Sequence, residues 1–238
     1  NASIISWVIL SFVAVYISTF FGELVAMFPK AGGVYEFSKH AYNRFTSFLM
    51  GWLAWIVGNL TTALLIVAAI DYLVPDSSQF FTKMIISIAL IIILNIIAFY
   101  GIEASGYVVV ILVVLSISII LSVILPGIFY MDLSNLTPLF AFGAVPILVT
   151  IFFIAECFFG WESATYLSEE TINPEKTIPK ALVYGTIIVG VLATAISLVS
   201  LGIVPWKILT AASAPLSLVF ERIYGSLGKI LNYGVFIA

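Results

Sequence analysis

The sequence predicts an all-α membrane protein with several spanning helices. Of its 238 residues, 63% are hydrophobic and only 9% are charged, whereas a soluble domain carries about 45–50% apolar and about 25% charged residues. Six apolar runs meet or approach the length of about 20 residues that a helix needs to cross a bilayer. The alternating windows of a membrane β-barrel are absent from the sequence. Backbone polar groups must therefore be satisfied inside helices, and the chain is predicted to be polytopic.

The predicted spans follow one another along almost the whole chain. They cover residues 4–28, 45–70, 84–100, 107–129, 144–168 and 181–204, and a truncated seventh run occupies 230–238. No charged leader precedes the first run, which is therefore predicted to be a span and not a signal peptide. Because the chain begins without Met and ends inside an apolar run, we expect 1–238 to be a single, partial transmembrane domain of a longer polypeptide.

Composition excludes several classes of function. Lys and Arg form no block of like charge, so a nucleic-acid surface is not expected. The single cysteine, Cys157, and the single histidine, His40, exclude a disulfide framework and a Cys/His zinc site. No nucleophile and base pair, phosphate-binding loop or cofactor motif is present. We therefore expect no enzyme activity and no bound metal or cofactor.

The loops between the spans carry the orientation signal. Short loops rich in Lys and Arg stay in the cytoplasm, and the first loop, 29–44, holds three such residues. This favours a cytoplasmic position for 29–44 and for 169–180, which lies on the same side of the predicted spans. The longest connection, 205–229, is amphipathic in its second half and predicts a helix on the outer surface. The expected location is the cell membrane.

Five residues with a carboxylate or amide side chain stand inside the first six predicted spans. They are Glu23, Asn59, Asn95, Glu156 and Glu162. An ionisable side chain at membrane depth costs a few kcal/mol and usually faces a cavity or a partner. For Asn95 we expect an interhelical hydrogen bond worth about 1 kcal/mol or less, and for Glu23 a structural role and a gating role are both open.

The fifth run differs from the other spans. Glu156 and Glu162 stand on either side of Gly160, and several hydroxyl side chains follow. Glycine costs about 1 kcal/mol relative to alanine in a helix interior, and a break there would free backbone groups to hold a ligand. Many secondary transporters build their midplane sites from such discontinuous helices. The alternative is a continuous helix in which Gly160 makes a close packing contact and the two acids reach toward the interface.

Three stretches of the sequence together resemble the amino acid permeases of the amino acid/polyamine/organocation transporter superfamily. The resemblance covers nearly the whole chain. The first stretch runs from Glu23-Leu24 through Phe28-Pro29 and Ala31-Gly32-Gly33 to Tyr35. The second is Gly51-Trp52-Leu-Ala-Trp55 with Gly58-Asn59. The third runs from Phe159-Gly160-Trp-Glu162-Ser163 to Glu169-Glu170-x2-Asn173-Pro174-x4-Pro179. The resemblance implies an inverted-repeat, LeuT-like fold of ten core helices, of which this chain would cover about helices 2 to 8.

The same resemblance implies roles for individual residues. Gly160 marks the unwound segment of helix six, Glu162 matches an acid that arginine-exchanging members use beneath the substrate, and Asn59 matches a side-chain contact from helix three. Glu156 stands where those exchangers have an aromatic residue, and Gly51 where they have a tyrosine, which argues against an arginine/agmatine exchanger. The substrate-binding candidates are Asn59, Glu156, Cys157, Gly160, Trp161, Glu162 and Ser163.

The implied function is secondary active transport of amino acids, or of related amines and polyamines, by alternating access. Glu156 would serve either as a proton carrier or as the counter-charge of a cationic substrate. The gating or coupling candidates are Glu23, Glu156, Glu162 and Ser116, the last standing near the position where some proton-coupled members carry a lysine. We expect coupling to protons in preference to sodium, or exchange, with the lipid bilayer and a small substrate as partners. The alternative is a sensor or partner subunit that keeps the fold without transporting.

Overall fold

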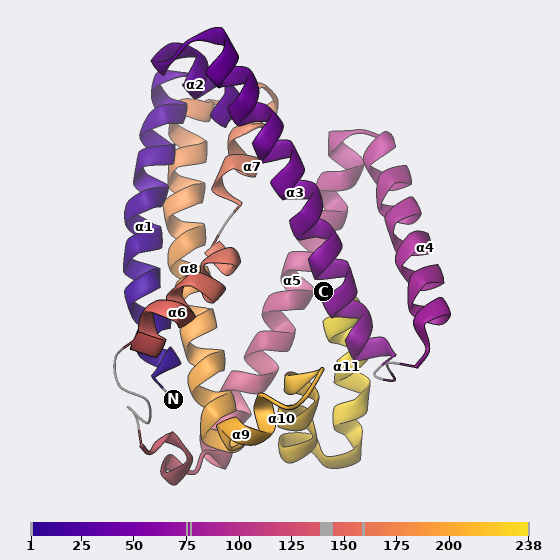
Figure 1. Cartoon of the computed structure of the whole chain (residues 1–238). Helices are drawn as coiled ribbons and strands as arrows, with labels where there is room; N and C mark the ends of the chain where they lie inside the picture. Colours follow the sequence, from indigo (N-terminus) through magenta and orange to yellow (C-terminus); the bar gives the residue numbers. More distant parts are fainter. Residues whose placement is uncertain (1, 75, 77, 139–144, 159, 238) are drawn as a thin grey trace. The chain divides into compact units, whose positions relative to one another are not determined.

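The computed structural model describes residues 2–237 except 75, 77, 139–144 and 159, together with their side chains apart from those of 102, 104, 161, 162 and 229 (Figure 1). The described residues form helices and turns, with no strand among them. Six segments of this part of the chain are long and apolar enough to cross a membrane: Ser3–Met27, Arg44–Leu73, Phe80–Phe99, Ser105–Tyr130, Val145–Thr165 and Pro174–Ile203. The chain is thus an all-α, multi-pass membrane protein.

Large apolar side chains cover much of the surface of these segments. Phe12 is 74% exposed, Leu64 61%, Ile111 66% and Phe152 77%. A water-soluble protein exposes contiguous apolar patches of only a few hundred Å², whereas hydrocarbon chains solvate such side chains without cost. The exposed side chains therefore fit a lipid environment.

The helices are numbered as in Figure 1. Their bounds are α1 Ser3–Met27, α2 Val34–Ala41, α3 Arg44–Leu73, α4 Phe80–Phe99, α5 Ile102–Gly127, α6 Val145–Ile154, α7 Trp161–Thr165, α8 Pro174–Ile203, α9 Trp206–Leu209, α10 Pro215–Tyr224 and α11 Gly228–Ile237. Short 3-10 turns cover Ile128–Tyr130, Leu133–Leu136, Ala155–Phe158, Ser168–Glu170 and Gly225–Leu227.

Three helices begin several residues earlier than the apolar runs predict. Helix α4 begins at Phe80 where the run predicts 84, α5 begins at Ile102 where the run predicts 107, and α8 begins at Pro174 where the run predicts 181. The turn between α4 and α5, and not hydrophobicity, sets the start of α5, because Gly101 has a φ of +99°. Such a conformation is readily available only to glycine. Apolar runs therefore locate these helices but not their ends.

The chain divides into two compact units, each made of two separate stretches of sequence. The first contains Asn1–Leu60 and Pro138–Ala195, and the second contains Thr61–Thr137 and Ile196–Ala238. The first unit therefore holds α1, α2, α6 and α7, and the second holds α4, α5 and α9 to α11.

In the first unit, α1 runs beside the broken segment α6–α7 and beside α8 (Figure 1). Helix α1 buries one stripe of mostly small side chains at three- and four-residue spacing. The stripe consists of Ser6, Leu10, Ala14, Ser18, Gly22 and Val25. A Cβ on Gly22 would lie 3.1 Å from Cβ of Pro179, and one on Gly190 would lie 2.8 Å from Oγ of Ser11. Small residues thus let α1 and α8 approach closely.

The second unit is centred on α5, α10 and α11, which contact one another. Val123 of α5 and Val219 and Phe220 of α10 are completely buried. The hydroxyl of Tyr224 donates a hydrogen bond of 2.7 Å to the backbone carbonyl of Ser122. Helix α10 is the amphipathic segment predicted within 205–229, and its apolar face packs into this core.

Candidate functional site

The fifth predicted span is interrupted in the structure. Helix α6 ends at Ile154, a 3-10 turn follows over Ala155–Phe158, and α7 begins at Trp161. Between them, Gly160 has φ +130° and ψ −6°, a conformation that L side chains rarely adopt. Apart from its chain neighbours, no atom of the described residues lies within 4 Å of the place where a Cβ on Gly160 would stand. The backbone, and not a packing contact, therefore requires this glycine, and the alternative of a continuous helix is wrong.

A pocket of about 280 Å³ opens at this break. It is lined by Cys157, Phe158 and Gly160 from the broken segment and by Ala181, Leu182, Gly185, Thr186 and Val189 from α8. The hydroxyl of Thr186 donates to the backbone carbonyl of Leu182 at 2.7 Å. The volume lies near the lower end of the range of roughly 300–1,000 Å³ typical of small-molecule sites. The pocket is mainly apolar, with polar groups supplied by the break and by one threonine.

The predicted site residues of this span fall into three groups. Cys157 and Gly160 line the pocket. Glu156 is half-buried and directly precedes Cys157 in the 3-10 turn, while Ser163 is exposed and its N–H donates to the carbonyl of Gly160 at 3.0 Å. The side chains of Trp161 and Glu162 lie outside the described residues. These roles remain predictions.

The remaining candidates are Asn59, Glu23 and Ser116. Asn59 is exposed, and its amide donates to the backbone carbonyl of Trp55 at 2.7 Å, within its own helix. Glu23 is exposed on α1. Ser116 belongs to the second unit, where its hydroxyl donates to the carbonyl of Leu112 at 2.8 Å. None of the three is among the described residues that line the pocket, and their roles also remain predictions.

The prediction for Asn95 was wrong. Its amide donates to the backbone carbonyl of Ile91 at 2.8 Å, and both residues belong to α4. The predicted interhelical bond is therefore replaced by a bond within the helix. The reason is geometric, because residues four positions apart lie on the same face of a helix. The backbone carbonyl of Ile91 is therefore close enough to accept a hydrogen bond from the Asn95 amide.

The loop after α1 packs against the end of the broken span. Gly33 has φ +50°, and a Cβ there would lie 2.5 Å from Oγ1 of Thr165 and 2.8 Å from Cε1 of Tyr166. The backbone N–H of Ala31 donates to the carboxylate of Glu169 at 3.3 Å. Glycine at position 33 therefore allows the loop to lie directly on α7 and the residue after it.

Helix α2 continues this contact. Phe37 belongs to the same buried cluster as Phe158, and the neighbouring Glu36 is buried as well, with its carboxylate 3.4 Å from Nζ of Lys39 and 3.2 Å from Nε2 of His40. Burial by itself would raise the pKa of the Glu36 carboxyl, but the hydrogen bonds with His40 and Lys39, together with their charges, lower this pKa below its ordinary value of 4.5. Glu36 therefore carries a negative charge that stabilises α2 through its interactions with Lys39 and His40.

The sequence analysis missed the contribution of α8. Gly185 and Thr186 line the pocket, although the run 181–204 was predicted only as a span. The available signal was a small residue beside a hydroxyl within an apolar run. That signal is weak, because threonine in a helix satisfies its hydroxyl on its own backbone.

Many secondary transporters consist of several apolar spans and have their binding site where a span is interrupted. This chain has several apolar spans and a pocket at the interruption of one of them. The family model described as amino acid permease matches residues 1–238. The chain belongs to the amino acid permease family.

Three relatives show the range of this similarity. A probable polyamine transporter of Arabidopsis thaliana is 30% identical over 71% of this chain and 34% of its own length. The branched-chain amino acid permease BcaP of Lactococcus lactis is 24% identical over 99% of this chain and 57% of its own. The methylthioribose transporter of Bacillus subtilis is 25% identical over 86% of this chain and 48% of its own. The chain thus spans between about a third and three fifths of the length of these relatives.

Proposed function

We propose that this chain forms part of a secondary active transporter that moves amino acids, or related amines and polyamines, across the cell membrane by alternating access. The observation that carries the proposal is the break at Gly160 in the fifth span, with a pocket beside it. Open backbone groups at such a break bind the charged ends of small substrates. Similarity to a probable polyamine transporter and to a branched-chain amino acid permease supports this substrate class.

Within this proposal, the site extends beyond the pocket lining. Cys157 and Gly160 contact the substrate, together with Asn59, Glu156, Trp161, Glu162 and Ser163, in the part of the site that this chain supplies. Glu156, Glu162, Glu23 and Ser116 act in gating or ion coupling, with protons preferred to sodium as the coupling ion.

The proposed orientation places loops 29–44 and 169–180 in the cytoplasm. The hydrogen bond between Ala31 and the Glu169 carboxylate supports a position on the same side for both loops. Lys and Arg residues in both loops agree with the cytoplasmic side.

Uptake by proteoliposomes containing the full-length protein tests the proposed function. Labelled amino acids and polyamines are supplied with and without an imposed pH gradient, and with and without sodium. We expect saturable uptake that external acid stimulates and sodium does not. If folded protein neither takes up nor exchanges any member of the panel, a non-transporting sensor or partner subunit becomes the better description.

Glu156→Gln tests the coupling role in the same vesicles. The amide keeps the shape of the side chain but holds no titratable proton and no negative charge. We expect loss of acid stimulation if Glu156 carries the proton, or loss of preference for cationic substrates if it is their counter-charge. Glu103→Gln, at the exposed start of α5, is the matched control. Wild-type coupling and selectivity in Glu156→Gln would contradict both roles.

A further inference from the structure

Helix α2 is a short helix between two spans and is not itself long enough to cross a membrane (Figure 1). Residues 28–33 connect it to the end of α1, and only residues 42–43 separate it from the start of α3. Because both neighbours are spans, these short connections keep α2 close to the end of each, at the level of the lipid headgroups. The exposed face of α2 therefore meets the membrane interface.

The two faces of α2 differ in character. The buried side chains are those of Glu36, Phe37 and Ser38. Tyr35 and Lys39 are exposed and lie on one side of the helix, because residues four positions apart share a face. Tyr42, directly after the helix, is 63% exposed. Tyrosine and lysine side chains combine an apolar body with a polar tip, which suits the boundary between lipid and water.

Contacts on the other side of α2 hold this exposed face in place. Phe37 belongs to a buried hydrophobic cluster of the first unit. The His40 ring stacks on the Phe28 ring, with centroids 4.2 Å apart and planes inclined by 14°. A Cβ on Gly51 would lie 3.2 Å from Cβ of Tyr35, so α3 packs directly on this tyrosine. The exposed face therefore belongs to a fixed element and not to a loose loop.

The segment from α2 to the start of α3 carries more positive than negative charge. It contains one acid, Glu36, whose buried carboxylate lies 3.4 Å from Nζ of Lys39. An ammonium group has three donors, and the Lys39 side chain remains 55% exposed. Arg44 is exposed, the first turn of α3 has no acidic residue, and no ion pair between described residues involves Arg44. Both cations can therefore donate to an anion outside the protein.

We propose that the exposed face of α2, together with Arg44, binds the headgroups of anionic phospholipids in the surrounding membrane. Lys39 and Arg44 donate charge-assisted hydrogen bonds to the lipid phosphate, while Tyr35 and Tyr42 lie beside the headgroups. A zwitterionic headgroup also carries an ammonium group, which these two cations repel. The cytoplasmic leaflet is the anionic one, which agrees with the proposed cytoplasmic position of 29–44. This proposal does not rest on the proposed transport function.

Enrichment of lipid beside α2 tests the proposal without requiring transport. Ala41→Cys, at the exposed end of α2, is introduced into full-length protein whose other cysteines are replaced by serine, and a fluorophore is attached to it. The protein is placed in phosphatidylcholine nanodiscs that contain a small fraction of doxyl-labelled phosphatidylglycerol or doxyl-labelled phosphatidylcholine, and quenching is measured. We expect the labelled phosphatidylglycerol to reach half-quenching at a fraction at least roughly tenfold lower, because each basic residue near the surface favours anionic lipid about fivefold.

Charge variants in the same background identify the partners. Lys39→Gln and Arg44→Gln are each expected to reduce the enrichment roughly fivefold, whereas Arg44→Lys keeps the charge and is expected to retain the enrichment. The control Lys207→Gln removes an exposed cation of α9 and should change nothing at position 41. Equal quenching by the two lipids when both cations are intact, or full enrichment in both glutamine variants, would overturn the proposal. A loss in Arg44→Lys as large as in Arg44→Gln would contradict the role of the charge.

Two measurements on protein that keeps both cations apply even if a charge variant does not fold. Raising the NaCl concentration from about 50 mM to about 500 mM screens the charges and is expected to reduce the enrichment severalfold, so enrichment that persists unchanged contradicts the proposal. Free glycerol 3-phosphate is expected to leave the quenching unchanged, because it lacks the acyl chains that hold a lipid at the membrane surface. Displacement of the labelled lipid by glycerol 3-phosphate would show a site for soluble phosphate instead.

Uptake separates this proposal from the proposed function. Labelled amino acids and polyamines are supplied to full-length wild-type protein in vesicles that contain phosphatidylglycerol. Enrichment without any uptake supports the lipid-binding face of α2 and contradicts the proposed transport function, whereas uptake without enrichment does the reverse.

Discussion

Helix α4 and the broken segment α6–α7 are both apolar enough to cross a membrane, but they are built differently. Helix α4 runs without interruption from Phe80 to Phe99, and none of its described side chains is buried. Segment Val145–Thr165 changes from α-helix to a 3-10 turn and passes through Gly160 before α7 begins. Its first helix packs on α1 and its break opens onto a pocket beside α8.

The comparison shows what interrupts a membrane helix. Each span contains polar residues, but Asn95 in α4 satisfies its amide on its own helix and leaves the backbone intact. In the fifth span a glycine in a left-handed conformation replaces a helical residue. A polar side chain alone therefore does not open a span, whereas a glycine that leaves the helical conformation does.

Gly160→Ala is expected to have the largest effect on transport, because it should make the fifth span as continuous as α4. Alanine at a φ of +130° costs about 1–3 kcal/mol, which favours a continuous helix across the pocket. We expect the rate of substrate uptake to fall at least roughly tenfold, measured in proteoliposomes. Gly106→Ala in α5, where a Cβ meets no atom of the described residues beyond its chain neighbours within 4 Å and φ is not positive, is the control and should keep its activity. Full uptake by Gly160→Ala would show that transport does not need the break.

Gly33→Ala tests whether the loop after α1 supports the broken span. The added Cβ would meet Thr165 and Tyr166, and such overpacking costs about 1–3 kcal/mol. We expect a lower temperature of thermal unfolding in detergent, with loss of uptake at the same time. Gly58→Ala in α3, where a Cβ comes within 4 Å of no described atom other than those of its chain neighbours, should unfold like wild type. Equal stability of both variants would mean that the loop moves aside without cost.

The charge on Glu36 is expected to make the stability of the folded protein depend on pH. The pKa of this carboxyl is below its ordinary value of 4.5 in the folded protein, so its carboxylate stabilises the fold above about that pH. This stabilisation is lost as pH falls from 4.5 through the lower folded pKa. Glu36→Gln should destabilise the protein by about 1 kcal/mol at pH 7, and the difference from wild type should shrink below pH 4.5.

Thermal unfolding of wild type and Glu36→Gln between pH 7 and about pH 3 measures this difference in stability. Glu175→Gln in the exposed first turn of α8 is the control. A stability difference that stays constant over this pH range would show that the carboxylate charge of Glu36 is not what holds α2.

Asn95→Leu in α4 is expected to have the smallest effect. The Asn95 amide bonds only to a carbonyl of its own helix among the described residues, and such bonds in membrane helices are worth less than about 1 kcal/mol. We expect uptake and unfolding temperature to stay at wild-type values, measured beside Gly160→Ala. A large loss of uptake or a large fall in the unfolding temperature of Asn95→Leu would show that α4 contributes more than a membrane-spanning helix.

The sequence by itself determined the membrane class, the helical architecture and the position of the break, because these depend on local properties. Long apolar runs require helices in lipid, and Gly160 between polar residues weakens its own helix whatever surrounds it. The same reasoning failed at Asn95, where the reach of the side chain decides its hydrogen-bond partner. It also failed at the ends of α4 and α5, where turn geometry decides.

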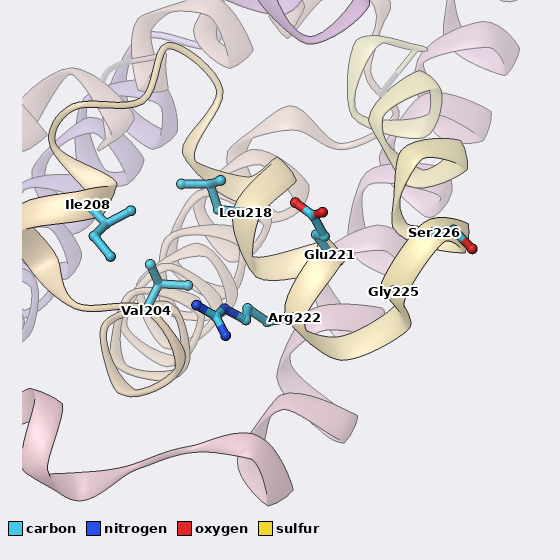
Figure 2. A pocket seen from close by; sticks show the side chains of 7 residues that line it. All are labelled: Val204, Ile208, Leu218, Glu221, Arg222, Gly225 and Ser226. Atoms are coloured by element: carbon cyan, nitrogen blue, oxygen red, sulfur yellow. The ribbon is translucent and has the colours of Figure 1, made fainter.

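Only the tertiary structure decided which residues meet. Thr186 lines the pocket at Gly160, Gly33 lies on Thr165, and Ala31 bonds to Glu169 across 138 positions of sequence. Glu221 and Arg222 stand in a segment that the sequence shows only as amphipathic, and in the structure they line a pocket with Val204 (Figure 2). Local pattern fixes what each segment becomes, whereas contacts between distant segments depend on packing that no single segment encodes.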